Sequence, residues 1–461
     1  MKKENYRNFR WNKEEGKSVG KVKKQYSLSP RRRSRFVPSS FLRGASWNDF
    51  ETTLVRLWYD FVSSRLRNLS GNGRMVRNVY KLWPLCWGGL LLLALAGCRG
   101  EMPFIYYEEE EVTSGRGTGG VKGFFLLNEG NMGSNKASID FFSCETGRYM
   151  RNIYPSRNPE IVKELGDVGN DIGIYGSKLY AVINCSHYVE VMDVSTAKHV
   201  GSIDVLNCRY ITFSGGKAYV SSYAGPVQID PDARPGKVVE VDTASLQVTR
   251  EVVVGYQPEE MVVADGKLYV ANSGGYRYPD YDTTVSVIDL ESFQVVKTID
   301  VAINLHRMEL DRYGRIYVSS RGDYYDVGAD VYVIDSRTDQ VLGNLGVTAS
   351  EMCLSGDSLY MTSVEWSYVT NSNTVAYTLY DVAREEVVSR NFITDGTDKQ
   401  IQVPYGMAVN PDTKEILVCD AKDYVTPGTL YCFSPEGTLE WQVTTGDIPA
   451  HFAFTTTSFQ E

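Results

Sequence analysis

Aromatic and charged residues recur at two kinds of position between residues 209 and 451, and together they suit ligand recognition. One kind directly precedes a stretch of alternating apolar residues, and the other follows a stretch centred on tyrosine. Aromatic side chains offer large, rigid contact surfaces with a polar tip, which a broad or planar ligand requires. The candidate ligand-binding residues are Arg209, Tyr210, Tyr223, Glu260, Tyr276, His306, Arg321, Tyr324, Tyr325, Trp366, Tyr368, Tyr405, Tyr424 and His451.

Catalytic chemistry has weaker support in the sequence. His306 and His451 could supply a ligand nitrogen or bind a metal, but a histidine at a strand end is more often a hydrogen-bonded structural group. The carboxylates that could form an acid–base pair are Asp171, Glu259, Glu260 and Glu351. No GxSxG, HExxH, CxxC or Walker-like segment occurs. We therefore expect a protein that is not an enzyme, with no metal and no cofactor.

Repeated strand patterns must position these residues. A glycine turn followed by a tyrosine-centred strand occurs at residues 176–182, 216–220, 266–270, 314–318 and 356–361. A β-branched run that ends in aspartate follows at residues 189–193, 238–242, 285–289 and 331–335. A polar turn and another β-branched run, such as 295–301, come next. This spacing predicts blades of four strands each.

An inner strand with alternating apolar residues precedes each glycine turn. Six such strands contain the pairs Ile172 and Ile174, Ile211 and Phe213, Met261 and Val263, Met308 and Leu310, Met352 and Leu354, and Met407 and Val409. Residues 449–454 form an inner strand with no strands after it, and residues 123–129 an outer strand with no inner strand before it. Pairing these two halves would complete a seventh blade and remove the open edges.

The sequence therefore predicts an all-β, seven-bladed β-propeller over residues 121–461, closed by its N- and C-terminal strands. In such a blade, the loop before the inner strand and the loop after the second strand emerge at the same end. We expect the candidate residues to converge there, around the central channel. The opposite loops, such as residues 195–198 and 291–294, are ordinary turns.

The repeats resemble those of the YVTN-repeat (YncE-like) propeller family. The resemblance rests on residues 269–272 (YVAN), 219–222 (YVSS) and 317–320 (YVSS), each followed by a Val-x-Val-x-Asp strand, and covers residues 121–456. It implies a YVTN/WD40-like propeller of the quinoprotein amine dehydrogenase-like superfamily. Residues 412–418 lack the tyrosine and residues 429–433 lack the aspartate, but neither departure threatens the fold.

Residues 75–97 have the organisation of a secretory signal peptide, with a short basic segment, an apolar run and small residues. Residues 95–98 (LAGC) resemble the lipobox of bacterial lipoproteins, which implies cleavage before Cys98 and acylation of that residue. Residues 1–74 precede this complete leader. We interpret them as a misassigned or non-native extension, with translation beginning at Met75, or alternatively as a cytoplasmic arm.

Residues 98–120 are predicted to form a tether. Their acidic stretch, residues 106–111, resembles the surface-export signal of Bacteroidetes lipoproteins, although a solvated acidic linker would look the same. The glycine-rich residues 114–120 favour flexibility in either case. We expect a protein that is lipid-anchored in the outer membrane and exposed at the cell surface.

Charge and cysteine content exclude further classes. The net charge is −9, and the part after the leader is strongly acidic without clustered lysine and arginine, which argues against nucleic-acid binding. The eight cysteines form no CxxC pair, so a zinc or redox motif is not indicated. Cys185 and Cys208 fall at the same end of neighbouring blades and are a candidate disulfide after export.

Three functions remain as hypotheses. The first is a non-enzymatic surface lipoprotein that captures an extracellular small molecule for an outer-membrane transporter. The overall layout resembles the Bacteroidetes propeller lipoproteins that bind cobalamin, so a corrinoid is the leading ligand. The second is an interaction module for a protein or glycan partner. The third is a propeller enzyme of the lactonase or lyase kind.

Overall fold

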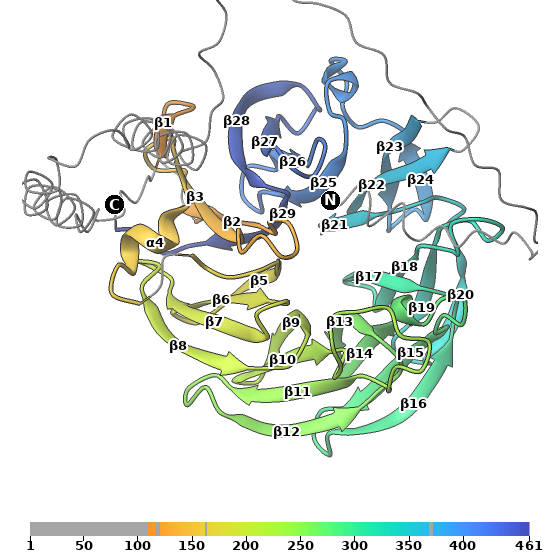
Figure 1. Cartoon of the computed structure of the whole chain (residues 1–461). Helices are drawn as coiled ribbons and strands as arrows, with labels where there is room; N and C mark the ends of the chain where they lie inside the picture. The colour runs from red at the N-terminus through yellow and green to blue at the C-terminus, as the bar shows by residue number, and fades with distance from the viewer. Residues whose placement is uncertain (1–107, 116–119, 162–163, 368–371, 461) are drawn as a thin grey trace, which may run out of the picture. The chain divides into compact units, whose positions relative to one another are not determined.

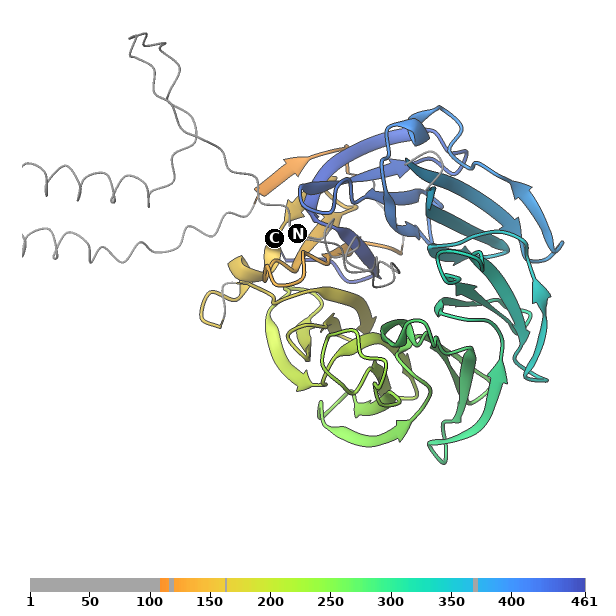
Figure 2. The same ribbon diagram turned by 45° about the vertical axis from the view of Figure 1, so that its right-hand side comes forward.

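The structure is a computed structural model that describes residues 108–115, 120–161, 164–367 and 372–460. Seven antiparallel sheets follow one another in a ring (Figure 1), and a second view shows the same ring (Figure 2). We call the region between the inner strands, which side chains fill, the channel. We number the blades 1 to 7 in chain order. The predicted seven-bladed propeller is confirmed.

Blades 2 to 4 each contain four strands, numbered from the inside outward. Blade 2 contains β5 (Gly169–Tyr175), β6 (Lys178–Ile183), β7 (Tyr188–Asp193) and β8 (His199–Asp204). Blade 3 contains β9 (Cys208–Ser214), β10 (Lys217–Ser222), β11 (Lys237–Asp242) and β12 (Val248–Val253). Blade 4 contains β13 (Pro258–Ala264), β14 (Lys267–Asn272), β15 (Thr284–Asp289) and β16 (Gln294–Asp300).

Blades 5 to 7 follow the same order. Blade 5 contains β17 (Leu305–Leu310), β18 (Arg315–Ser320), β19 (Asp330–Asp335) and β20 (Gln340–Asn344). Blade 6 contains β21 (Glu351–Ser355), β22 (Ser358–Ser367), β23 (Ser372–Asp381) and β24 (Glu386–Ser389). Blade 7 contains β25 (Pro404–Val409), β26 (Ile416–Asp420), β27 (Pro427–Phe433) and β28 (Leu439–Asp447).

Blade 1 is assembled from both ends of the described chain. Its strands from the inside outward are β29 (Pro449–Thr455), β2 (Gly123–Asn128), β3 (Ser138–Ser143), β4 (Arg148–Arg151) and β1 (Glu108–Glu111). Within the described ranges, one short α-helix, α4 (Ile153–Arg157), and two 3₁₀ turns, η1 (Gly275–Arg277) and η2 (Thr397–Lys399), complete the elements. Among the described residues, no helix is both long and apolar enough to cross a membrane.

The ring closes where the sequence predicts. β2 pairs with β29 in antiparallel register, from Gly123 opposite Thr455 to Asn128 opposite Pro449. The Phe124 ring packs edge-on against the rings of Phe452 and Phe454, with centroids 5.6 and 5.8 Å away. The strand from residue 123 is the second strand of its blade rather than an outermost one, because β3, β4 and β1 lie outside it.

The acidic part of the predicted tether belongs to blade 1. Residues Glu108–Glu111 form β1, which pairs with β4, and Glu108 and Glu109 form ion pairs with Arg151 and Arg148. These opposite charges across the strand pair explain why an acidic segment adds to this edge. β1 therefore forms the outermost strand of the blade 1 sheet.

The tyrosines of the repeats join the blades together rather than line the channel. Tyr180, Tyr269 and Tyr317 are fully buried in the second strands. The Tyr269 hydroxyl in blade 4 donates a hydrogen bond of 2.8 Å to the Ser336 carbonyl of blade 5. The glycine turn before each tyrosine has left-handed backbone, for example φ +77° at Gly266 and +83° at Gly314, which suits a tight hairpin.

Candidate functional site

The start of every inner strand lies at one end of the channel, which we call the mouth. Register places Pro258 opposite Asn272, Leu305 opposite Ser320, and Pro404 opposite Asp420, so the loops after the second strands emerge there too. The predicted convergence of the two loop types at one end is therefore confirmed. Whether the residues there bind a ligand stays a prediction.

A β-bulge at the start of six of the seven inner strands aims extra side chains at the channel. Two residues of the inner strand there oppose one residue of the second strand, so neighbouring side chains need not point to opposite faces. In blades 3, 4 and 5 the bulged pairs are Arg209–Tyr210, Glu259–Glu260 and His306–Arg307, and both members of each pair contact channel residues. These pairs supply four of the site's charged side chains, which are Arg209, Glu259, Glu260 and Arg307.

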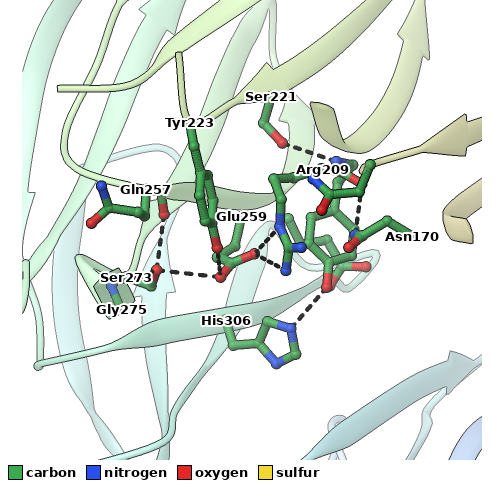
Figure 3. A network of polar contacts seen from close by, with 12 residues as sticks. Asn170, Arg209, Ser221, Tyr223, Gln257, Glu259, Ser273, Gly275 and His306 are labelled. Atoms are coloured by element: carbon green, nitrogen blue, oxygen red, sulfur yellow. Dashed lines mark hydrogen bonds and ion pairs between the residues drawn. The ribbon is translucent and has the colours of Figure 1, made fainter. Parts of the chain in front are cut away.

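The first group at the mouth, the Arg209 cluster, consists of Arg209, Tyr223, Glu259, Ser273 and Arg321 (Figure 3 shows all but Arg321 labelled). The Arg209 Nε and Nη2 atoms donate to Glu259 Oε2 at 3.2 and 3.1 Å. The Tyr223 hydroxyl and, at 3.3 Å, the Ser273 hydroxyl donate to Glu259 Oε1. Arg321 Nη1 lies 3.5 Å from the same oxygen.

Glu259 is the centre of this cluster and is 1% exposed. Burial alone would raise the pKa of its carboxyl, but the guanidinium groups of Arg209 and Arg321 outweigh burial and hold the pKa below its usual value. Glu259 is thus an anion at neutral pH that is shared by two cations. Its oxygens are occupied by donors, so it suits a positioning role better than proton transfer.

Tyr210, His306 and His451 fill the channel beside this cluster, and we call them the channel plug. The Tyr210 hydroxyl of blade 3 lies 2.8 Å from His306 Nε2 of blade 5. The Tyr210 ring packs edge-on against the His451 ring of blade 1, with centroids 6.4 Å apart. The three residues are 3%, 7% and 8% exposed. A ligand would therefore bind on the mouth rather than enter the channel.

Both histidines of the plug are neutral at physiological pH. Burial lowers the pKa of His306 well below its usual value, and the nearby charges of Arg321, Arg307 and Arg209 lower it further. Burial also lowers the pKa of His451, although the neighbouring Glu129 carboxylate acts in the opposite direction. A neutral imidazole can accept the Tyr210 proton in a hydrogen bond, which explains the close contact.

The second group, the Arg307 cluster, begins one position further along the inner strands. Arg307 Nη2 lies 2.5 Å from Glu351 Oε2, and Arg307 Nη1 lies 3.7 Å from Glu260 Oε1. Asp171 and Glu309 also lie within range of the Arg307 charge. Four carboxyl groups thus surround one guanidinium group.

Burial raises the pKa of these carboxyl groups, to about 7 for Asp171 and about 8 for Glu309 and Glu351, and repulsion from Glu260 adds to the effect. The cluster therefore holds protons at neutral pH, because one cation cannot stabilise four buried or partly buried anions. Three of the carboxylates also bind the next inner strand: Asp171 accepts from Ile211 N at 2.8 Å, Glu260 from Met308 N at 2.6 Å and Glu309 from Leu354 N at 3.3 Å.

Blades 1 and 7 form the far side of the mouth. The Tyr405 hydroxyl donates to Glu129 Oε2 at 2.9 Å, and the Tyr424 ring packs edge-on against Tyr405 at 5.9 Å. Blade 7 has glycine at the second bulge position, because a Cβ at Gly406 would lie 2.2 Å from the Ala450 carbonyl oxygen of β29. The two inner strands approach closely there, and the side chains of the Arg307 cluster come from the other blades.

The predicted ligand-binding residues divide by exposure. Tyr324 and Tyr325, at 58% and 59% exposed, and the partly exposed Tyr276 and Arg321 present surface at the mouth. Tyr210 and Tyr223 are only 3% and 5% exposed, because their hydroxyl groups are bound to His306 and Glu259. These two tyrosines organise the mouth, so the exposed aromatic surface is smaller than the sequence suggests.

Some predicted residues fall outside the described part of the chain. Trp366 lies in β22, but its side chain is not among those described, and Tyr368, Cys98 and residues 1–107 lie outside the described residues. The predictions of a signal peptide and a lipid anchor therefore stay predictions.

The candidate disulfide is not formed in this structure. Cys185 and Cys208, both within the described part, are two thiols rather than a cystine. The Cys208 side chain is fully buried, and its Sγ lies 3.5 Å from the carbonyl oxygens of Ile183 and Tyr188. Cys208 packs in the apolar core between blades 2 and 3, and a disulfide formed after export stays a prediction.

Several site residues were not among the predicted ligand-binding residues, although Asp171, Glu259 and Glu351 were predicted as carboxylates that could form an acid–base pair. Glu259, Arg307, Asp171 and Glu351 occur at the starts of inner strands in the sequence, but nothing there shows that they pair with one another. Glu309 lies two positions beyond the bulge and has no sequence signal. Glu129 follows the second strand of blade 1, and equivalence with the other second-strand exits could have identified it.

A possible metal-binding group lies away from the mouth. Within the described ranges, Glu415, Cys432 and Glu440 of blade 7 have ligand atoms within 4.8 Å of one another. Glu415 precedes Ile416, which pairs with Val409 at the end of β25 distant from the mouth. This group is separate from the Arg209 and Arg307 clusters.

Comparisons with known proteins agree with the fold. The model of a family described as a domain of unknown function (DUF5074) matches residues 122–448. No curated protein matches the chain. A hypothetical selenium-binding protein from Sulfolobus tokodaii has a similar structure, with a TM-score of 0.53, 10% identity, and coverage of 75% of this chain and 97% of that chain.

Two further solved structures are similar at lower scores. A quinonprotein alcohol dehydrogenase-like protein from Bacteroides thetaiotaomicron has a TM-score of 0.48 and 17% identity, over 72% of this chain and 78% of that chain. Hydrazine synthase from Kuenenia stuttgartiensis has a TM-score of 0.49 and 18% identity, over 61% of this chain and 88% of that chain. At such identities, these likenesses concern the fold alone.

Proposed function

The chain belongs to the DUF5074 family, whose description names no activity, and from this premise we propose that the propeller is a non-enzymatic binding protein that captures an extracellular ligand at its mouth. One observation carries the proposal: two arginines share one buried carboxylate at the mouth, and tyrosine and serine hydroxyls hold that carboxylate in place. Such a pre-organised polar surface favours binding, because little ordering is required when the ligand arrives.

The position of the other carboxylates supports binding over catalysis. Near the mouth, the carboxyl groups with raised pKa belong to the Arg307 cluster, which starts one position further from the mouth and is occupied by Arg307 and backbone amides. The channel plug occupies the space beside it. The carboxyl group of the Arg209 cluster, Glu259, is buried and is kept ionised by the two arginines, so it is not placed to transfer a proton to a substrate on the mouth.

The finer proposal concerns the ligand and the location. The signal-peptide pattern, the lipobox at Cys98 and the resemblance to cobalamin-binding surface propellers support capture of a corrinoid at the outer surface for uptake by a transporter. A corrinoid is broad and would cover the mouth rather than enter a pocket. Tyr324 and Tyr325 are exposed on one loop at the mouth and could contact such a face.

The test is retention of colour. The purified full-length protein is incubated with cyanocobalamin, washed by gel filtration, and its visible absorbance is recorded. We expect retained absorbance, and about tenfold weaker binding for Tyr324→Ala, since a well-packed tyrosine contributes about 1.4 kcal/mol. Tyr313→Ala is the matched control, because Tyr313 is 39% exposed and lies in the β17–β18 turn, away from the mouth.

Two outcomes would count against the proposal. No retained absorbance in the wild-type protein would remove the corrinoid, and equal loss in both tyrosine variants would remove the mouth as its binding surface. Turnover of a lactone by the purified protein, lost in Glu351→Gln, would instead favour a propeller enzyme of the lactonase or lyase kind.

A further inference from the structure

Charge is unbalanced at the mouth. In the Arg209 cluster, two guanidinium groups face one carboxylate, and the neighbouring His306 is neutral. The carboxylates of the Arg307 cluster do not correct this balance locally, because they are engaged by Arg307 and by backbone amides. The cluster therefore carries a surplus positive charge beside solvent.

Arg321 carries this surplus. Arg209 forms two contacts with Glu259 Oε2 at 3.2 and 3.1 Å, and its guanidinium group also lies over the Tyr223 ring at 4.9 Å. Arg321 shares Glu259 Oε1 with the Tyr223 and Ser273 hydroxyls and has the longest contact, 3.5 Å. A guanidinium group has five N–H donors, and Arg321 makes only this one long contact with Glu259, so Glu259 cannot satisfy Arg321.

The surroundings of Arg321 suit a ligand rather than solvent alone. Its side chain is 30% exposed, compared with 15% for Arg209 and 7% for Arg307. Tyr324, 58% exposed, lies near enough to affect the Arg321 charge. The loop that carries Tyr324 is held in shape by Asp323, whose Oδ1 accepts hydrogen bonds from the backbone nitrogens of Tyr325, Asp326 and Val327 at 2.8, 2.9 and 2.8 Å.

We propose that Arg321 is an oxyanion subsite of the mouth, which binds a carboxylate or phosphate group of the ligand through its free guanidinium edge, with the Tyr324 hydroxyl beside it. A guanidinium fork matches the two oxygens of either group, and the charge-assisted hydrogen bonds are stronger than neutral ones. The subsite rests on the proposed binding function and adds to it the chemical class of one ligand group.

Arginine-specific labelling tests the subsite directly. The full-length protein is treated with phenylglyoxal in sodium chloride, inorganic phosphate, dimethyl phosphate or acetate at equal ionic strength, and modification of each arginine is followed by peptide mass spectrometry. We expect labelling at Arg321 to slow by about fivefold in at least one oxyanion, as for a site about four-fifths occupied. Arg337, which is exposed in the β19–β20 turn, should be unaffected.

The arms of the experiment identify the source of the oxyanion. Protection by dimethyl phosphate points to a phosphodiester, and protection by acetate points to a carboxylate. Equal labelling of Arg321 in all four salts, or equal protection of Arg321 and Arg337, would overturn the subsite. Retained corrinoid without protection of Arg321 would leave the proposed binding function standing and remove this subsite alone.

A second readout separates binding from a merely structural role. The chain has four histidines, so the imidazole signals can be assigned by NMR. An anion on Arg321 would offset the charge that depresses the pKa of His306, so that pKa should rise when the protective oxyanion is added. Arg321→Lys should keep part of this response and Arg321→Gln should abolish it; a response that persists in Arg321→Gln would contradict the proposal.

Discussion

The Arg209 cluster and the Arg307 cluster are neighbours along the channel, with Glu259 and Glu260 at successive positions of β13, but their charge balances are opposite. At the mouth, two arginines share Glu259, and the carboxyl stays ionised. One position further, Arg307 is surrounded by four carboxyl groups, which retain protons because one cation cannot compensate for all of them. The fold thus provides two adjacent rings of channel positions, and the side chains decide whether a ring attracts an anion or holds protons.

The largest expected effect comes from removing the single cation of the Arg307 cluster. Arg307→Met should lower the free energy of unfolding by about 4 kcal/mol at pH 8, because buried carboxylates lose their partner. The loss should be smaller at pH 5, where protonated carboxyl groups need no cation. Urea denaturation followed by circular dichroism at both pH values measures this.

Arg337→Met is the control for the Arg307 variant, since Arg337 is exposed in a turn and should change stability little. If Arg307→Met is unfolded at pH 8 but folds at pH 5, this result also shows the predicted larger loss of stability at pH 8. Equal losses at pH 5 and pH 8 would show that the four carboxyl groups do not share the Arg307 charge.

A slightly smaller effect, with a different pH dependence, is expected for the Arg209 cluster. Glu259→Gln should cost about 3 kcal/mol, because Arg209 and Arg321 lose the buried anion between them. The pKa of Glu259 is below its usual value, so the carboxyl is ionised from pH 5 to pH 8 and the loss should be nearly constant over that range. The same urea denaturation series measures it.

Glu291→Gln, at an exposed turn away from the mouth, is the matched control for Glu259→Gln. A loss for Glu259→Gln that disappears at pH 5 would mean that Glu259 takes up a proton like the carboxyl groups of the other cluster. The contrast between the two clusters would then fail.

The smallest expected effect is a gain in stability. The pKa of Glu309 is about 8 in the folded protein, above its usual value of 4.5, because burial and then the Glu260 charge disfavour its anion. The folded state binds more protons than the unfolded state between these values, so stability falls as the pH rises through that window. Glu309→Gln should therefore be more stable than wild type by about 2 kcal/mol at pH 8, about half of what the full shift would give because Glu309 is only partly buried, and similar to it near pH 4.5.

The glutamine keeps an oxygen that can accept the hydrogen bond from Leu354 N, so the contact between inner strands survives. Thermal melts of wild type and Glu309→Gln across this pH range give the comparison. Parallel pH profiles for the two proteins would mean that Glu309 does not hold a proton in the folded state.

The sequence predicts the fold well because the propeller repeats one local pattern. The turn, the buried tyrosine and the β-branched third strand each follow from short-range rules, and the seven repeats reinforce each other. Ring closure through Phe452 and Phe454 also follows, because residues 123–128 and 449–455 are the two incomplete halves of one blade. The end at which the candidate residues gather depends only on strand order.

The chemistry of the site is harder to predict, because it depends on contacts between blades. Nothing local shows that Tyr223 of blade 3 binds Glu259 of blade 4, or that Tyr210 reaches His306 two blades away. Bulges decide which side chains reach the channel, and their positions are not visible in the alternation of apolar residues. For the same reason the sequence counts Tyr210 and Tyr223 as ligand contacts, whereas the structure buries both.

The pairing of β2 with β29 also has a consequence for how the protein is made. β2 is among the first propeller strands to be synthesised, but its inner neighbour, Pro449–Thr455, comes after all six of the other blades. The ring contacts of Phe124 with Phe452 and Phe454 can therefore form only after the last strand has been synthesised. Until then, the unpaired edge of β2 is exposed to other chains. Closure is a contact of very high sequence separation, so we expect it to be the last and slowest step of folding.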